Sequence, residues 1–233
     1  PVDTSYTVNS AFNKSVKKFP KIEIVKPDFF ENVIEIKDIV YKNIDDRKLH
    51  LDAFYNKSEQ LKPAVILVHG GGWKSGNKSH MEPMAQHIAS KGYACFAVEY
   101  RLSPEAIFPA GIYDIKNAIQ FVKANAKEFK IDTNKVAILG CSSGGQMASL
   151  IGTKYSNLVQ AIVNLDGVLA FHHPESQEGK LAAEWLGGTY EEKPEIWEDA
   201  SPLTHANEKT PPIIFAKTYS LLVAANLPVM FKA

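Results

Sequence analysis

Hydrophobic and polar positions divide the chain into a polar start, an alternating pair of segments and an apolar body. Residues 1–32 are polar and weakly periodic, which predicts an N-terminal arm on the surface of the domain. Residues 33–41 and 48–54 are rich in β-branched side chains and partly alternate apolar with polar, and the turn-forming run 43–46 separates them. This pattern predicts an antiparallel hairpin at the edge of a sheet.

Fully apolar runs begin after the hairpin. A strand that is buried on both faces of a parallel sheet has no polar alternation, and four segments have this character. They are residues 64–68, 93–100, 135–139 and 158–165. A last strand is predicted over 212–217.

The segments between these runs have the spacing of amphipathic helices. We expect helices over 80–91, after Pro109 and over about 144–152. Strands that alternate with helices predict an α/β fold, a three-layer α/β/α sandwich around a mostly parallel sheet. Residues 166–210 break the rhythm with several Pro and Gly, and we expect them to form an excursion over the active site.

The composition fits one globular domain spanning residues 1–233. Lys+Arg and Asp+Glu are both 26, so the net charge gives no reason to expect nucleic acid or an anionic membrane as a partner. No run of apolar residues is long enough for a transmembrane helix. Cys95 and Cys141 are too few for a disulfide framework and are expected to be buried. The first residue is Pro1, which suggests a processed mature form.

The segment Gly140-Cys141-Ser142-Ser143-Gly144 fits the pattern G-x-S-x-G. It follows an apolar run and precedes a helical pattern, which is the context of a nucleophile elbow. The tight turn pushes Ser142 Oγ out of the carboxyl edge of the sheet and places the Ser143 N–H at a helix N-terminus. We therefore predict that Ser142 is a catalytic nucleophile. An ordinary strand-to-helix turn that binds phosphate is the alternative.

A glycine-rich loop, His69-Gly70-Gly71-Gly72-Trp73, follows the first fully apolar run. A carbonyl attacked by a serine develops an oxyanion, which needs N–H donors held in advance. Consecutive glycines let backbone N–H groups face such a site, so Gly71 and Gly72, together with Ser143, are the predicted oxyanion hole. His69 is predicted to order this loop through hydrogen bonds rather than to act as a base.

Two further segments, VEYRLSPE at 98–105 and FPAGIYDIK at 108–116, complete a resemblance. With the glycine loop and the serine motif, they resemble the hormone-sensitive-lipase-like and bacterial carbohydrate-esterase branch of the α/β-hydrolases, over about residues 33–217. The nearest likeness is to acetyl, feruloyl and pectin-side-chain esterases. The resemblance implies the α/β-hydrolase fold and ester hydrolysis with neither a metal nor an organic cofactor. It leaves the location open, with a secreted or periplasmic mature form as its only indication.

The same resemblance implies structural roles for three residues. Arg101 and Asp114 are expected to pair and tie a loop to a helix, and Glu99 is expected to hold that network.

The usual acid and base of the family have no counterpart in the sequence. In this family the acid follows the next-to-last strand and the histidine follows the last. Residues 212–217 resemble the next-to-last strand, but the atypical apolar tail 218–233 contains no Asp, Glu or His. The final strand and helix are therefore expected to be lacking, as in a truncated C-terminus.

Three routes to a base remain open. Substitutes within the chain are Asp166, His172, His173 and His205. The apolar tail and an open sheet edge favour a homo-oligomer, in which a neighbouring subunit completes the site. Without any base, the oxyanion donors alone would leave weak activity.

These features predict a serine esterase that acts on a small-molecule ester. The predicted substrates are short acyl esters, of the acetyl or feruloyl type and of plant carbohydrate, hydrolysed through an acyl-enzyme on Ser142. The alternative is a degenerate hydrolase that binds ester or carbohydrate ligands with little turnover. Trp73 and Phe171 are candidate walls of the pocket, with plain core packing as the alternative for both.

Overall fold

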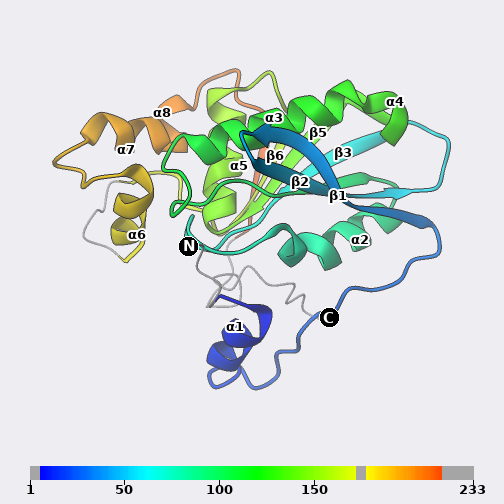
Figure 1. The fold of residues 1–233 in the computed structure, drawn as a ribbon, viewed down its shortest axis with the longest axis horizontal. Helices are drawn as coiled ribbons and strands as arrows, with labels where there is room; N and C mark the ends of the chain where they lie inside the picture. The colour runs from blue at the N-terminus through cyan, green and yellow to red at the C-terminus, as the bar shows by residue number, and fades with distance from the viewer. Residues whose placement is uncertain (1–5, 172–176, 217–233) are drawn as a thin grey trace.

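A single twisted sheet forms the centre of the protein in the computed structural model, which describes residues 6–171 and 177–216 (Figure 1). The seven strands lie in the order β1-β2-β4-β3-β5-β6-β7. Their bounds are β1 Val33–Ile44, β2 Arg47–Asn56, β3 Lys62–Val68, β4 Ala94–Val98, β5 Ile131–Cys141, β6 Ala161–Leu165 and β7 Ile213–Ala216.

Strand direction follows the hydrophobic pattern of the sequence. The hairpin β1–β2 is antiparallel and pairs antiparallel with β4, whereas β3, β4, β5, β6 and β7 run parallel to one another. Parallel strands end at the same edge of a sheet, so the segments that follow β3, β5 and β6 come together there. Val68 at the end of β3 pairs with Gly140, and Cys141 at the end of β5 pairs with Leu165.

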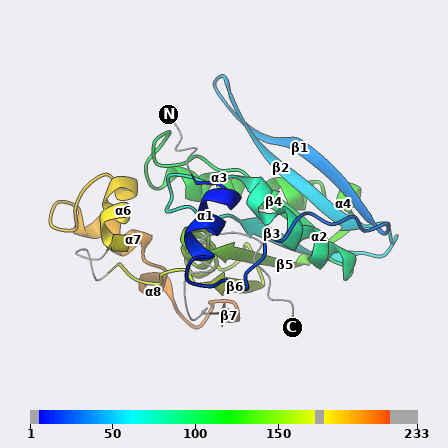
Figure 2. The ribbon, with the colours of Figure 1, turned by 90° about the horizontal axis from the view of Figure 1, so that it is seen from below.

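Helices cover both faces, which confirms the predicted three-layer sandwich. Figure 1 shows α3, α4 and α5 on one side of the sheet and α2 on the other, and Figure 2 views the α2 side with α1 beside it. The helices of the body are η1 Lys78–Met81, α2 Glu82–Ser90, α3 Ala110–Ala124, α4 Ala126–Phe129 and α5 Ser143–Lys154.

The arm and the excursion contain helices that the pattern did not predict. In the arm, α1 (Val8–Ser15) begins at a capping box between Thr7 and Ser10. The excursion carries three short helices, α6 Gln177–Leu186, α7 Pro194–Ala200 and α8 Pro202–His205. The strand expected from residue 158 begins at Ala161, because the Leu158 N–H donates to the Tyr155 carbonyl in a turn.

Two hydrophobic clusters fill the spaces between the layers. The larger cluster packs α3 and α5 against the sheet, and it includes Ile115, Ile119 and Met147. The smaller cluster packs α2 against the other face through Met81 and Ala85. Cys95 and Cys141 lie in this smaller cluster as free thiols, and burial raises the pKa of both. Their expected burial is therefore confirmed.

The predicted pair of Arg101 and Asp114 is confirmed. The Asp114 carboxylate is fully buried and accepts hydrogen bonds from the Arg101 Nε at 2.8 Å and the Arg101 backbone N–H at 3.1 Å. Lys42 is a second residue that pairs with this carboxylate, at 2.7 Å. The loop after β4 is thereby tied both to α3 and to the hairpin.

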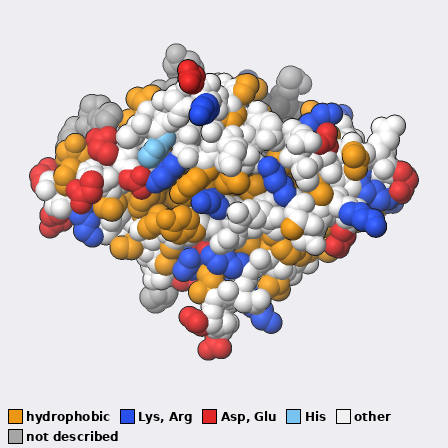
Figure 3. Space-filling view, turned by 90° about the horizontal axis from the view of Figure 1, so that it is seen from above, with side chains coloured by type: hydrophobic (Ala, Val, Ile, Leu, Met, Phe, Trp, Pro, Cys, Tyr) orange, Lys and Arg blue, Asp and Glu red, His pale blue; other side chains and the backbone are white. Residues whose placement is uncertain are grey.

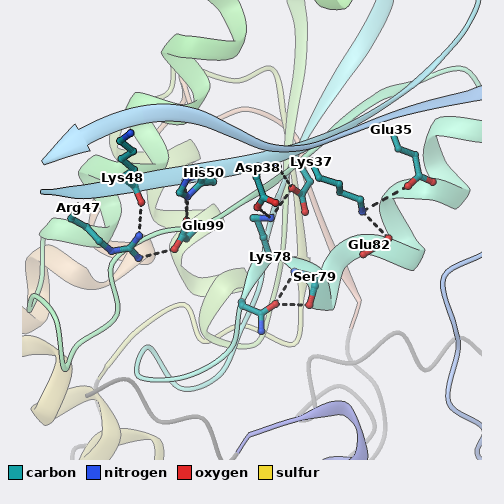
Figure 4. A network of polar contacts seen from close by, with 12 residues as sticks. Glu35, Lys37, Asp38, Arg47, Lys48, His50, Lys78, Ser79, Glu82 and Glu99 are labelled. Atoms are coloured by element: carbon teal, nitrogen blue, oxygen red, sulfur yellow. Dashed lines mark hydrogen bonds and ion pairs between the residues drawn. The ribbon is translucent and has the colours of Figure 1, made fainter.

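The role predicted for Glu99 is wrong. Figure 4 shows its carboxylate between Arg47 and His50, and among the described residues no hydrogen bond joins it to Arg101 or Asp114. The Arg47 guanidinium lies 2.6 Å from one oxygen, and the His50 backbone N–H donates to the other at 2.9 Å. Glu99 follows β4 directly, so its side chain faces the antiparallel strand β2 and binds the groups that β2 presents.

The surface carries charges of both signs. Figure 3 shows Lys and Arg side chains mixed with Asp and Glu on one face, with hydrophobic side chains between them. Within the described part of the chain, no helix is long and apolar enough to cross a membrane.

The β6–β7 end of the sheet is the least covered. On the α2 side, the register pairs Val163 with Ile214 and Leu165 with Ala216, so these side chains share a face. Ile214 is 64% exposed. The tail 218–233 lies outside the described residues, so the predicted lack of a final strand and helix stays a prediction.

Candidate active site

Ser142 lies at a sharp turn between β5 and α5. Its backbone has φ 51° and ψ −123°, a region that residues other than glycine rarely adopt. The strain is held by hydrogen bonds, because the Ser142 N–H donates to the Leu165 carbonyl at 2.8 Å and the Ser142 carbonyl accepts from the Gln146 N–H at 3.0 Å. The backbone therefore has the conformation of the predicted elbow.

Two glycines of the motif are required by close backbone contacts. A Cβ on Gly140 would lie 2.0 Å from the Gly144 carbonyl oxygen. A Cβ on Gly144 would lie 2.3 Å from the Val68 carbonyl oxygen and 2.4 Å from that of His69. The first turn of α5 thus contacts the backbone at the end of β3, where the glycine loop starts. The structure brings the two sequence motifs together.

The glycine loop has an unusual backbone of its own. Gly71, Gly72 and Trp73 have φ values of 126°, 60° and 61°. The Gly71 carbonyl accepts from the Ser75 N–H at 3.1 Å and the Ser75 hydroxyl at 2.8 Å, which closes the loop on itself. Within residues 6–171 and 177–216, the backbone N–H groups of Gly71, Gly72 and Ser143 have no acceptor. These donors can bind an anion beside Ser142, so their role as an oxyanion hole stays a chemically consistent prediction.

His69 is a structural residue of this loop, as its surroundings show. Its Nδ1–H donates to the Gly70 carbonyl at 2.8 Å, and its ring stacks on Tyr100 with centroids 4.5 Å apart. The Tyr100 hydroxyl donates to the His69 carbonyl at 2.7 Å. Burial lowers the pKa of His69 to about 4, so the ring is neutral at pH 7. A buried ring with this pKa is a poor proton acceptor.

A buried aromatic cluster supports the other side of the loop. Trp73 stacks on Trp185 with centroids 5.1 Å apart, and Phe171 packs against both. Trp73 is 4% exposed and Phe171 is 5% exposed. Both side chains therefore pack in the core, which favours that alternative over the pocket wall.

Gln146 makes a buried structural contact beside the site that was not predicted from the sequence. Its Oε1 accepts from the Trp73 indole N–H at 2.9 Å, and its Nε2 donates to the Ala200 carbonyl at 2.7 Å. One buried amide thus joins the glycine loop, α5 and the end of α7. The sequence does contain a signal for this contact: Gln146 is the one large polar side chain in the first half of α5, whose other residues are small or apolar.

Of the three candidate histidines, the structure describes His205 alone. His205, at the end of α8, donates from Nε2 to the Asp199 carbonyl at 2.9 Å, which uses that nitrogen. His172 and His173 lie outside the described residues. No hydrogen bond joins Ser142 Oγ to a histidine in the part of the chain that the structure describes.

Of the two suggested substitutes that the structure describes, Asp166 lies nearer the elbow, because it follows β6, whose last residue Leu165 accepts from the Ser142 N–H. It follows β6 with φ 60°, and its N–H donates to the Ala216 carbonyl at 3.0 Å. Its side chain is exposed and faces a cavity of about 290 Å³. The walls of the cavity are Asn164, Asp166, Gly167, Val168, Phe215 and Ala216.

Metal chemistry has no candidate ligand set in the described residues. No group of three His, Cys, Asp or Glu side chains there could hold an ion.

Charged residues anchor the segment that follows the loop. Lys78 in η1 lies 2.8 Å from Asp38 and 2.6 Å from the buried Asp52 (Figure 4). The hairpin strands β1 and β2 thus hold the segment that follows the glycine loop, and strand β3 holds the segment that precedes it.

Comparison with known proteins gives a family. The family model BD-FAE matches residues 51–220, which is well over half of the chain. The esterase LipC of Mycobacterium tuberculosis is 28% identical over 191 residues, which cover 73% of this chain and 47% of that protein. The chain thus spans about half the length of this curated relative.

Two solved structures are also similar to this chain. A bifunctional GH43-CE protein of Bacteroides eggerthii has a TM-score of 0.68 at 27% identity, covering 78% of this chain and 30% of that one. An acetyl ester-xyloside bifunctional hydrolase from Caldicellulosiruptor lactoaceticus has a TM-score of 0.65 at 27% identity, covering 73% and 66%.

The contact of the elbow with β3 gives a stability prediction. Gly144→Ala places a methyl group against two backbone carbonyls that cannot move aside, so we expect the free energy of unfolding to fall by about 3 kcal/mol or more. Gly92→Ala is the matched control, because nothing lies within 4 Å of its Cβ and only its φ of +99° opposes the change. Its expected cost is about 1 kcal/mol. Urea unfolding followed by circular dichroism measures both, and equal losses would contradict the prediction.

The buried His69 predicts how stability depends on pH. Its pKa in the folded protein, about 4, lies below the ordinary value of 6.5, so this contribution is complete above pH 6.5 and is lost as the pH falls toward 4. The full effect is about 3 kcal/mol. In urea unfolding between pH 7.5 and pH 4, His69→Asn should lose less stability than the wild type. His87→Asn, at an exposed histidine, should keep the wild-type slope. Parallel curves for the wild type and His69→Asn would exclude this effect.

Proposed function

The chain belongs to the BD-FAE family of α/β-hydrolase esterases, and we propose that it is a carboxylic ester hydrolase with Ser142 as its nucleophile. The observation that carries the proposal is the packing of Gly144 against the carbonyls of Val68 and His69. This contact sets the strained serine beside the glycine loop. An acyl group attacked at Ser142 Oγ then lies within reach of backbone donors from both motifs.

The proposed reaction uses these parts in sequence. Ser142 Oγ attacks the ester carbonyl carbon, and its proton passes to a base. The negative charge that develops on the carbonyl oxygen is stabilised by the N–H groups of Gly71, Gly72 and Ser143. Collapse of this intermediate breaks the bond to the alcohol, which leaves protonated, and an acyl-enzyme remains. Water then attacks the acyl group by the same route and restores Ser142.

We propose short acyl esters, of the acetyl or feruloyl type and of plant carbohydrate, as substrates. Leu181 of α6 lies over the loop, with its Cδ1 3.3 Å from the place of a Cβ on Gly72. This methyl limits the space above the proposed oxyanion donors, so it favours the acetyl type over the larger feruloyl group. The acetyl ester-xyloside hydrolase among the solved structures supports a carbohydrate as the alcohol.

A second candidate function is ligand binding with little turnover. Its support is that, in the described residues, no histidine contacts Ser142. Oxyanion donors and substrate binding without a base still give residual catalysis. The two candidates differ in rate and share the same binding site.

Turnover of a p-nitrophenyl ester series by the wild type and Ser142→Ala tests the nucleophile. For an esterase, we expect Ser142→Ala to lower kcat by at least about 10³-fold on the acetyl ester, because the acyl-enzyme cannot form. We also expect a mass increase of one acyl group on the wild type under rapid quenching. Ser156→Ala, in the turn that follows the far end of α5, is the matched control and should keep full activity.

Other outcomes of this experiment separate the two candidates. Equal rates for the wild type and Ser142→Ala would overturn the nucleophile. A low rate for the wild type, with saturable binding of a carbohydrate acetate that both proteins share, would favour the binding function.

We also propose that the protein is a homo-oligomer. The outer edge of β7 has no partner strand in the described residues, and its neighbouring face exposes Ile214 beside Val163 and Leu165. Unpaired strand edges and exposed apolar side chains favour association. A second copy of the chain that packs on this face would cover both.

Sedimentation velocity tests this assembly. We expect the wild type to sediment as a dimer or larger species and Ile214→Lys to sediment as a monomer, because a buried lysine has no partner in the interface. Leu61→Lys is the matched control, since Leu61 is 69% exposed in the turn between β2 and β3. A monomeric wild type, or a mutant that still associates, would contradict the proposal.

A further inference from the structure

We infer that Gln146 is a positioning residue of the proposed active site, whose buried side-chain amide holds the glycine loop in a fixed place relative to Ser142. The inference rests on the proposed function, and it concerns how precisely the proposed oxyanion donors are placed. Gln146 is fully buried, so it acts on an ester only through other residues. The residue that it acts through is Trp73, which directly follows the proposed donor Gly72.

The backbone of Gln146 has a fixed position relative to the nucleophile. Its N–H donates to the Ser142 carbonyl at 3.0 Å, which closes the first turn of α5. The turn after β6 packs on the same nitrogen, since a Cβ on Gly167 would lie 2.4 Å from it. The Gln146 side chain therefore starts from a point that cannot move without Ser142.

The side chain of Gln146 joins this point to the glycine loop. Its Oε1 accepts from the Trp73 indole N–H at 2.9 Å, and its Nε2 donates to the Ala200 carbonyl at 2.7 Å. An indole N–H can only donate and a carbonyl can only accept, so these two partners allow one orientation of the amide. The bond to Ala200 thus keeps the amide oxygen turned toward Trp73.

Trp73 has a backbone that needs this support. Its φ of 61° costs free energy for a residue with a Cβ, and such a conformation persists only where the surroundings hold it. Its carbonyl accepts from the Ser103 N–H at 2.8 Å. Its ring stacks on Trp185 with planes 12° apart, which prevents tilting but allows the ring to slide in its own plane. The indole N–H lies in that plane, so its bond to Gln146 stops the sliding.

The placement of Trp73 affects the proposed oxyanion hole. A shift of the indole moves the backbone of Trp73 and of the adjoining Gly72. Hydrogen bonds weaken steeply as their distance and angle depart from the optimum. The charge that the Gly72 N–H would bind develops only in the transition state. Loss of the Gln146 amide should therefore lower kcat and leave KM nearly unchanged.

The test measures kcat and KM for p-nitrophenyl acetate in the wild type, Gln146→Met, Trp73→Phe and the double variant, with the rate of Ser142→Ala subtracted as background. Met keeps the length of the side chain without the amide, and Phe keeps an aromatic ring without the N–H. We expect each single variant to lower kcat by at least about tenfold with KM within twofold, since removal of a whole oxyanion donor costs about 10²–10³-fold. The double variant should match the weaker single variant, because both changes break the same hydrogen bond.

Gln86→Met is the matched control. Gln86 is another buried glutamine with two hydrogen bonds, from the Asp28 N–H at 2.9 Å and to Glu35 at 2.7 Å. It lies in α2, on the other side of the sheet (Figure 1). In urea unfolding, we expect Gln86→Met and Gln146→Met both to lose stability, because each leaves buried polar groups unpaired. Only Gln146→Met should lose kcat.

Three outcomes would overturn the inference. They are a wild-type kcat in Gln146→Met, an equal loss of kcat in Gln86→Met, and losses that multiply in the double variant. If Gln146→Met does not fold, Trp73→Phe decides alone, and a wild-type kcat there rejects the role of Gln146. In all these cases, a wild-type rate above that of Ser142→Ala leaves the proposed esterase intact. Equal rates for the wild type and Ser142→Ala would overturn the proposed function, and this inference with it.

Discussion

The site depends on one close backbone contact, that between the first turn of α5 and the end of β3. Only glycine at positions 140 and 144 allows this contact, since a Cβ at either position would overlap a carbonyl oxygen. Because of this contact, the strained Ser142 and the glycine loop are parts of one rigid unit. Gln146 extends that unit to Trp73 and to the end of α7 through two buried hydrogen bonds.

Much of this arrangement could be predicted from the sequence, because it follows from local pattern. Apolar runs predicted the strands, and the glycines around Ser142 predicted the elbow, since both signals lie within a few residues. The contacts that the sequence did not reveal join distant segments. Glu99 binds Arg47 and His50 across β2, and Gln146 reaches Ala200 in the excursion. Such partners depend on strand order and helix packing, which no short window contains.

The proposed oxyanion donors and the turn after β6 differ in how the fold holds them. The proposed donors Gly71, Gly72 and Ser143 belong to backbone that follows the central strands β3 and β5, where Gly144 packs against the carbonyls of Val68 and His69. The turn after β6 is held by the Asn164 amide, by the packing of Gly167 on α5 and by the bond from the Asp166 N–H to the Ala216 carbonyl, and it borders β7, the last strand of the described sheet. Asp166 is exposed there, whereas Ser143 is buried.

This difference separates binding from turnover in physical terms. The oxyanion donors are backbone groups, so their positions persist as long as β3, β5 and α5 pack together. In the proposed reaction, proton transfer needs a side chain within hydrogen-bond reach of Ser142 Oγ, at the carboxyl edge of the parallel strands. A chain that keeps its central contact but changes at this edge would still bind an ester and polarise its carbonyl. In the proposed reaction, the rate of hydrolysis would then depend on the side chains at this edge, and affinity on the backbone donors.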